Sequence, residues 1–152
     1  MKKSVFVTGA HDGTGFAIAE RFAKEGYDVF IGSREKEKAD SAAAKLCEKY
    51  GVFAKGYVYQ TVTLDEYEVK AIFDDIRANG YLLDTLVLNA ANLGIGQVSL
   101  DVNINEFMGV YTTNIGWNFL MSREAAKQMR EKGKGASVFI GSNSSVRVTE
   151  TR

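Results

Sequence analysis

A cluster of residues near the start of the chain has the types and spacing needed to bind a phosphate group. Thr8-Gly9 is followed by Gly13 and Gly15, directly after an apolar run and directly before an amphipathic segment. We expect Gly9 to allow a tight turn, Gly13 to admit a pyrophosphate, and Gly15 to let the following helix lie close to the strand. The helix N-terminus would offer free N–H groups and a positive dipole end. The intervening residues are also expected at this dinucleotide-binding turn: His11, Asp12 and Thr14.

The end of the second apolar run, residues 29–31, determines which dinucleotide is expected. An acidic residue there binds the ribose 2′-OH of NAD and repels a 2′-phosphate, whereas an arginine pairs with that phosphate. This chain has Ser33 and Arg34 in that place and no acid at the strand end. Asp12 would oppose the phosphate, and a protonated His11 would offset it. The residues therefore favour NADP as cofactor, with NAD as the alternative.

Strand-like and helix-like segments alternate along the chain, which is typical of a parallel sheet with helices on both faces. The expected strands are 5–8, 29–31, 53–59, 85–88 and 137–140. The expected helices are 16–24, 33–50, 63–78 and 105–132, with Ser33 and the Thr63/Glu66 pair as their predicted caps. Right-handed crossovers then give the strand order 3-2-1-4-5. We therefore predict one doubly wound, Rossmann-type α/β domain over residues 1–152, truncated after its fifth strand.

The Thr-Gly-x3-Gly-x-Gly spacing resembles that of the short-chain dehydrogenase/reductase family. Residues 88–91 partly match the Asn-Asn-Ala-Gly segment of that family, and this match implies that Asn89 and Ala90 lie near the adenine ribose. Residues 61–63 stand where the family has an aspartate that contacts adenine, so only the Val62 backbone is left for that contact.

The same resemblance implies two catalytic residues and a reaction. Asn114 lies where the family has an asparagine that supports a proton relay, and the glycine that usually follows falls one position early, at Gly116. Ser142 matches the serine that hydrogen-bonds the substrate carbonyl or alcohol, and Ser144 is the second choice. The implied reaction is hydride transfer between NADP(H) and a carbonyl compound or secondary alcohol.

The family's tyrosine and lysine pair is not found in this chain. The tyrosine acts as general acid/base, and a lysine four residues later lowers its pKa. No tyrosine of the chain has a lysine at that spacing, and counting from Ser142 places the pair just past Arg152. The chain is therefore either the N-terminal part of a reductase, inactive by itself, or a short nucleotide-binding module without hydride chemistry. A methyltransferase is a weaker alternative. Such an enzyme would need an acidic residue at the end of the second strand to bind a ribose, and this chain has none there.

Composition narrows the expected partners. The chain has 19 basic and 19 acidic residues, which predicts no nucleic-acid binding, and its apolar runs are too short to span a membrane. One histidine and one cysteine offer no metal cluster, and the single Cys47 suits the reducing cytoplasm. We expect a small-molecule substrate. We also expect a homo-oligomer, because the fifth strand would leave an apolar sheet edge.

Overall fold

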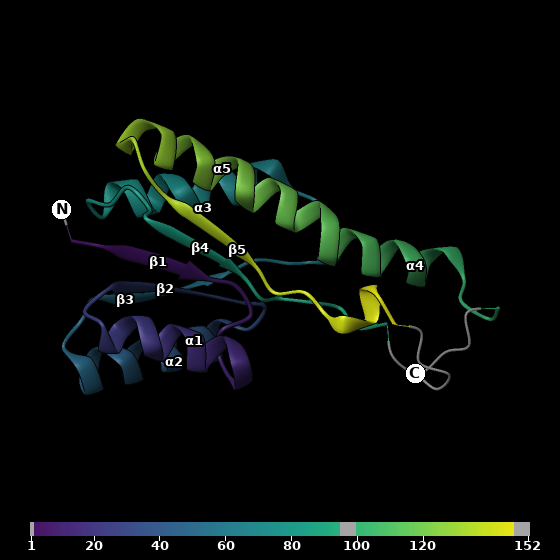
Figure 1. Ribbon diagram of the computed structural model, residues 1–152, viewed down its shortest axis with the longest axis horizontal. Coiled ribbons are helices and arrows are strands. Elements are labelled where there is room, and N and C mark those ends of the chain that lie inside the picture. Colours follow the sequence, from purple (N-terminus) through teal and green to yellow (C-terminus); the bar gives the residue numbers. More distant parts are fainter. Residues whose placement is uncertain (1, 95–99, 148–152) are drawn as a thin grey trace.

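The computed structural model describes residues 2–94 and 100–147, and across these ranges five parallel strands form one sheet (Figure 1). The strand order is β3-β2-β1-β4-β5, which confirms the predicted order and the Rossmann-type fold. The strands are β1 (Ser4–Val7), β2 (Asp28–Ser33), β3 (Ala54–Val58), β4 (Thr85–Leu88) and β5 (Ala136–Phe139). The helices are α1 (Gly13–Lys24), α2 (Lys36–Tyr50), α3 (Glu66–Ala78), α4 (Ile104–Tyr111) and α5 (Trp117–Lys132).

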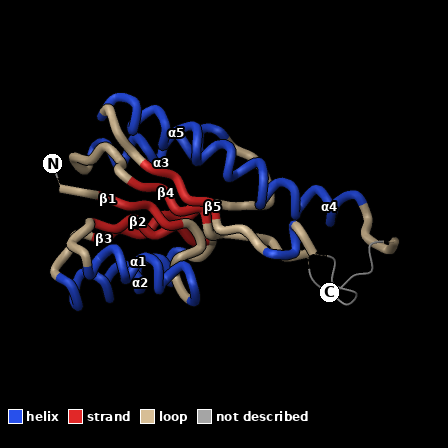
Figure 2. Tube along the Cα trace, viewed as in Figure 1, coloured by secondary structure: helices blue, strands red, loops and turns tan. Residues whose placement is uncertain are grey.

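The sheet lies between two layers of helices (Figure 2). Helices α1 and α2 cover one face, and α3 and α5 cover the other. Successive side chains of β1 point to opposite faces, so Phe6 packs below α3 and α5 whereas Val5 and Val7 pack against α1 and α2. Burial on both faces explains why the inner strands are continuously apolar.

Two predicted helix starts were wrong. Ser33 does not begin a helix, because its carbonyl accepts the Tyr59 N–H at 3.2 Å and so extends the sheet; Glu35 precedes α2 instead. The Thr63/Glu66 capping box is also absent. The Asp65 carboxylate caps α3 by accepting the N–H groups of Tyr67 and Glu68 at 2.9 and 3.2 Å. An ionised carboxylate is a stronger acceptor than a threonine hydroxyl, and it fixes the helix start two residues later.

The long helical stretch predicted over residues 105–132 is present, but it is not regular. Helix α4 passes into a π-helical turn, Thr112–Gly116, and this turn passes directly into α5. In Figure 1, α4 continues the line of α5 beyond the sheet. We refer to Thr112–Gly116 as the π turn. Such turns are short local departures from α-helix and are frequent at functional sites.

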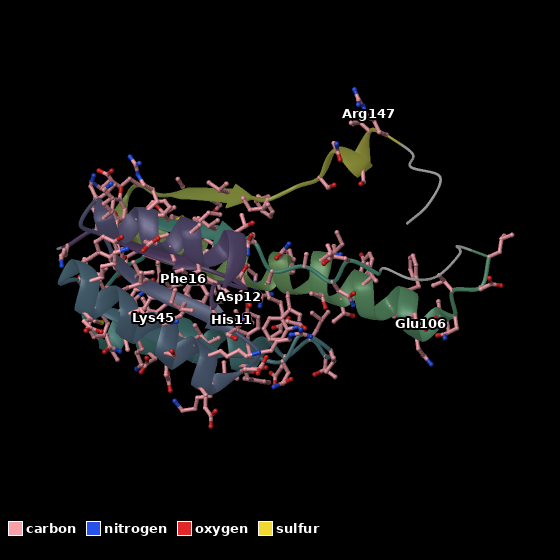
Figure 3. All side chains as sticks on the ribbon, turned by 90° about the horizontal axis from the view of Figure 1, so that it is seen from below. His11, Asp12, Phe16, Lys45, Glu106 and Arg147 are labelled. Carbon is pink, nitrogen blue, oxygen red and sulfur yellow. The ribbon has the colours of Figure 1, made fainter. Side chains whose placement is uncertain are left out.

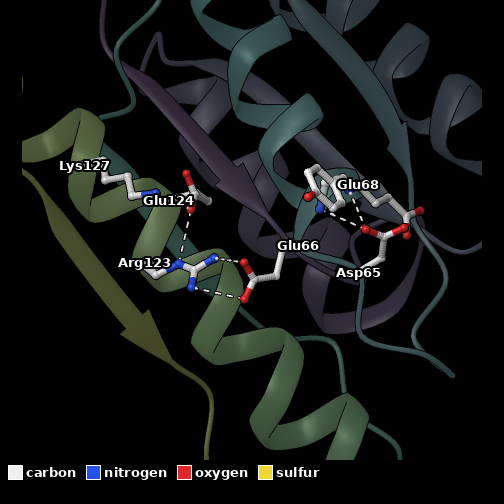
Figure 4. A network of polar contacts seen from close by, with 7 residues as sticks. Asp65, Glu66, Glu68, Arg123, Glu124 and Lys127 are labelled. Atoms are coloured by element: carbon white, nitrogen blue, oxygen red, sulfur yellow. Dashed lines mark hydrogen bonds and ion pairs between the residues drawn. The ribbon is translucent and has the colours of Figure 1, made fainter.

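Charged groups connect α3 to α5 (Figure 4). The Arg123 guanidinium on α5 lies 3.2 Å from the Glu66 carboxylate at the start of α3 and 3.2 Å from that of Glu124. Lys127 contacts the same Glu124 carboxylate at 2.6 Å. The ion pair between Arg123 and Glu66 joins the first turn of α3 to α5, and the contacts of Glu124 with Arg123 and Lys127 lie within α5.

Strand β5 forms one edge of the sheet. It pairs with β4 in the register Leu88↔Phe139, and all of its residues are exposed. Among the described helices, none combines the length and the apolar character needed to cross a lipid bilayer.

Candidate nucleotide-binding site

A cleft of about 480 Å³ opens at the carboxyl ends of the central strands. In open parallel sheets, ligands bind at this edge, where neighbouring strands connect in opposite directions; here that point lies between β1 and β4. The cleft contains these residues predicted from the sequence: Gly9, His11, Ser33, Arg34, Val62, Asn89 and Ala90. Its other described lining residues are Tyr59, Thr61, Ala91, Asn92, Leu93, Gly109 and Thr113.

The turn after β1 requires glycine at several positions. Gly9 has a φ of +60°, and a Cβ there would lie 2.9 Å from the Ala90 Cα. A Cβ on Gly15 would lie 2.3 Å from the Gly9 carbonyl oxygen, so the close approach of α1 to the turn excludes any side chain. Gly13 differs, because it has a φ of +54° but no atom within 4 Å of the Cβ position. The backbone at Gly13 therefore faces open space.

The turn is fixed to the end of β4 by hydrogen bonds. The Thr8 hydroxyl accepts the N–H groups of Asn89 and Ala90 at 2.9 and 3.0 Å. In return, the Asn89 Nδ2 group donates to the carbonyls of Thr8 and Gly9 at 3.2 and 3.1 Å. Thr8 and Asn89 thus set the position of the turn relative to the cleft floor. Thr8 itself is buried and does not line the cleft.

The first turn of α1 presents unpaired backbone donors beside the cleft. Asp12 precedes the helix, and its side chain makes no capping hydrogen bond. The N–H groups of Gly13, Thr14 and Gly15 have no acceptor within the helix, since the first amides of any α-helix lack one. The same end carries the positive pole of the helix dipole. This combination suits an anion such as a pyrophosphate.

A polar corner lies at the end of β2. His11 Nδ1 is 3.0 Å from the Ser33 hydroxyl, and that hydroxyl accepts the Glu35 N–H at 3.1 Å. His11 Nε2 lies 3.4 Å from the Asp12 carboxylate, and Figure 3 shows these two side chains together. Arg34 is exposed on the cleft wall, and it takes part in no ion pair within residues 2–94 and 100–147. Its guanidinium is therefore available to an anion.

Tyr59 lines the cleft but was not among the site residues predicted from the sequence. It is 2% exposed, and burial raises the pKa of its hydroxyl well above the ordinary value, so the group is a neutral donor and acceptor. Gly32 makes room for it, since a Cβ there would lie 2.9 Å from the Tyr59 ring. The signal available in the sequence was an aromatic residue directly after the third strand, together with a glycine near the end of the second.

The two residues predicted to be catalytic lie in different places. Asn114 is in the π turn and holds the backbone of Asn92, which lines the cleft. Ser142 is exposed, and its hydroxyl accepts the Ser144 N–H at 3.1 Å at the start of a 3₁₀ turn, Asn143–Ser145. Ser142 is not among the described lining residues of the cleft, and Arg147 farther along stands well away from His11 and Asp12 (Figure 3).

Within the described part of the chain, no three His, Cys, Asp or Glu side chains are arranged to hold a metal ion.

The candidate site consists of a glycine turn, a helix N-terminus, an unpaired arginine and a polar cleft wall. Together with the strand order, these features are those of a Rossmann-type fold with a candidate nucleotide-binding site at the carboxyl ends of its strands.

The chain belongs to the short chain dehydrogenase family, whose sequence model matches residues 3–151. A 3β-hydroxysteroid dehydrogenase of Mediterraneibacter gnavus is 32% identical over 96% of this chain and 51% of its own length. A very-long-chain 3-oxoacyl-CoA reductase of Anas platyrhynchos is 35% identical over 90% of this chain and 44% of its own length.

Solved structures are similar over almost the whole chain. A variant of actinorhodin polyketide ketoreductase with NADPH superposes with a TM-score of 0.88 at 28% identity, over 98% of this chain and 56% of that one. L-sorbose reductase of Gluconobacter frateurii, complexed with NADPH and L-sorbose, gives a TM-score of 0.90 at 26% identity, over 99% and 56%. The chain thus spans about half the length of the proteins that it resembles.

Proposed function

We propose that the protein is an oxidoreductase that transfers hydride between NADP(H) and a carbonyl compound or secondary alcohol. The observation that carries the proposal is the unpaired Arg34, which stands beside Ser33 on the wall of a cleft whose floor is the glycine turn. A cation there, with no acid at the end of β2, suits a 2′-phosphate. The NADPH complexes of the ketoreductase and the sorbose reductase support the same cofactor, with NAD as the alternative.

The residues present suit the adenosine, the 2′-phosphate and the pyrophosphate of this dinucleotide. The pyrophosphate would lie against Gly9 and the first turn of α1, where Gly13 leaves open space and a side chain at Gly15 would collide with backbone. The 2′-phosphate would lie at Arg34, Ser33 and His11. The adenosine would lie between the Val62 backbone and the end of β4 at Asn89 and Ala90.

When bound, the nicotinamide supplies or accepts the hydride. The Ser142 hydroxyl would donate a hydrogen bond to the substrate oxygen and so stabilise negative charge that develops there. Asn114 would support proton transfer by fixing the Asn92 backbone beside the cleft. We assign no proton donor within these 152 residues, because none of their tyrosines is followed four residues later by lysine.

Oxidation of NADPH in the presence of a panel of ketones and aldehydes tests the proposed reaction. We expect turnover with at least one carbonyl class in the protein that carries this chain, and a loss of about 100-fold in Ser142→Ala. Ser144→Ala is the matched control and should retain most of the rate. Equal rates in all three proteins would contradict the role of Ser142.

A second candidate function is nucleotide binding without hydride transfer. It requires only the glycine turn and the cleft beside Arg34, both of which the described residues contain. The same assay separates the two functions, because a binding module would hold NADPH and oxidise none of it with any carbonyl tested.

We also infer that the protein forms a homo-oligomer and works in the cytoplasm. Exposed apolar side chains follow one face of α4, the π turn and α5, as expected of a surface that a second copy covers. They are Ile104, Phe107, Met108, Tyr111, Ile115 and Phe119. We call them the apolar stripe. The free Cys47 is compatible with a reducing compartment.

A further inference from the structure

The loop between β3 and α3, residues 59–65, forms one wall of the cleft and is fixed from behind by the π turn and α5. The Trp117 Nε1–H donates to the Thr63 carbonyl at 2.9 Å. The Thr113 hydroxyl donates to the Thr61 carbonyl at 3.2 Å. These bonds hold the backbone on both sides of Val62, whose side chain is exposed at the cleft.

Trp117 contacts this wall at a second point. Its ring packs on Tyr59 with the centroids 5.0 Å apart and the planes tilted by 31°. Tyr59 lines the cleft, whereas Trp117 is 2% exposed and does not. A single buried side chain thus supports both the aromatic part and the backbone part of the wall.

The neighbouring Gly116 makes this arrangement sterically feasible. A Cβ on Gly116 would lie 2.6 Å from the Leu64 side chain, so the absence of a side chain there lets the loop settle on the helix. Arg123 adds a contact about two turns farther along α5, since it holds Glu66 at the start of α3 (Figure 4). Gly116 therefore leaves room for the Leu64 side chain, and the next residue, Trp117, brings its indole N–H to the Thr63 carbonyl.

We infer that Trp117 is a positioning residue for nucleotide binding. It holds the Tyr59 ring and the backbone around Val62 where the adenosine half of a dinucleotide would meet them. This inference rests on the proposed function, because it assumes that the cleft binds such a nucleotide. A wall held in its binding geometry before the ligand arrives avoids the entropy cost of ordering it on binding.

The substitution Trp117→Phe tests this role, since it keeps an aromatic ring against Tyr59 and removes the N–H donor to Thr63. The probe is adenosine 2′,5′-bisphosphate, titrated calorimetrically into the full protein. We expect its affinity to fall about 3- to 10-fold, the effect of one lost hydrogen bond. NADPH affinity should fall by the same factor, whereas kcat at saturating NADPH should stay unchanged.

The matched control is Gln128→Met on the same helix. The Gln128 side chain also bridges buried backbone, since it donates to the Phe73 carbonyl at 2.8 Å and accepts the Leu83 N–H at 3.0 Å, but it does not line the cleft. This variant should lose stability and keep its affinity for the probe.

If Trp117→Phe also kept that affinity, Trp117 would be a structural residue only and the inference would be overturned. Failure of the unsubstituted protein to bind the probe would contradict the proposed function, and this inference with it.

Fluorescence gives a second readout without any substitution, because Trp117 is the single tryptophan of the chain. Its indole is bonded to the wall that the adenosine would contact, so saturation with adenosine 2′,5′-bisphosphate should shift or change its emission. An emission spectrum that stays the same at saturation would count against the inference.

Discussion

Asn114 and Asn92 are joined by two hydrogen bonds across 22 residues of sequence. The Asn114 Oδ1 atom accepts the Asn92 N–H at 2.8 Å, and its Nδ2 group donates to the Asn92 carbonyl at 2.9 Å. Asparagine is disfavoured inside a helix unless its side chain finds such a partner. The pair fixes the segment after β4 to the π turn, and with it one end of the cleft.

The substitution Asn114→Asp should break this pair at constant size. A carboxylate can still accept the Asn92 N–H, but it has no donor for the Asn92 carbonyl and places negative charge against it. We expect the free energy of unfolding to fall by about 1–3 kcal/mol. Urea denaturation measures this loss. Asn105→Asp, exposed in the first turn of α4, is the control and should be almost neutral.

Two glycines of the phosphate turn should respond differently to the same substitution. Gly15→Val should prevent normal folding, because its Cβ would lie 2.3 Å from the Gly9 carbonyl oxygen. Gly13→Val meets no atom within 4 Å, so it should fold with a strain of about 1–2 kcal/mol and yet lose nucleotide binding. Circular dichroism and NADPH titration of both variants check this. A folded Gly13→Val protein with undiminished NADPH affinity would refute the assignment of the turn.

The predictions from sequence were most accurate for the sheet. Apolar runs bounded by turn residues gave β4 its observed bounds, Thr85–Leu88, and the handedness of crossovers gave the strand order. Helix starts were less accurate, because several polar residues near each start can cap it. Asp65 and Glu35 precede the observed helices, whereas Thr63 and Ser33 lie outside them.

The candidate site was predictable only where a local motif defined it. The glycine turn and Arg34 follow from spacing, since the chain itself brings them to the end of a strand. Tyr59, Trp117 and the Asn114–Asn92 pair depend on contacts between residues 22 to 58 positions apart. No pattern in the sequence predicted the π turn, although Gly116 lies within it.

Asp28 makes stability depend on pH. Its carboxylate is buried and accepts Lys2 Nζ, the Tyr81 hydroxyl and the Phe53 N–H at 2.7, 2.8 and 2.8 Å. Burial acts to raise the pKa of this carboxyl, but the bonds from Lys2, Tyr81 and Phe53 hold it below the usual value. The stabilisation is therefore complete above the unfolded-state pKa of about 3.9 and is lost as pH falls through the lower folded-state pKa.

The substitution Asp28→Asn removes this ionisation. We expect about 1–3 kcal/mol less stability at pH 7, because one acceptor becomes a donor facing Lys2 or Tyr81. Urea denaturation at pH 7 and at about pH 2 checks this. The gap between the two proteins should narrow at the lower pH, and a constant gap would contradict the account.

The apolar stripe should govern association. Ile115→Lys places a charge in the middle of the stripe and should reduce the mass measured by light scattering from that of an oligomer to that of a monomer. Tyr67→Lys removes an exposed aromatic residue from α3, outside the stripe, and should leave the mass unchanged. If Ile115→Lys kept the oligomeric mass, the stripe would not be the interface.

The most direct test of the proposed site is calorimetric titration of the protein with NADPH and NADH, alongside Arg34→Ala. We predict that NADPH binds more tightly than NADH by about 1–3 kcal/mol, the value of a charge-assisted pair with the 2′-phosphate. Arg34→Ala should abolish this preference and leave NADH affinity almost unchanged. Equal affinities in the unsubstituted protein, or a preference for NADPH that survives in Arg34→Ala, would contradict the account.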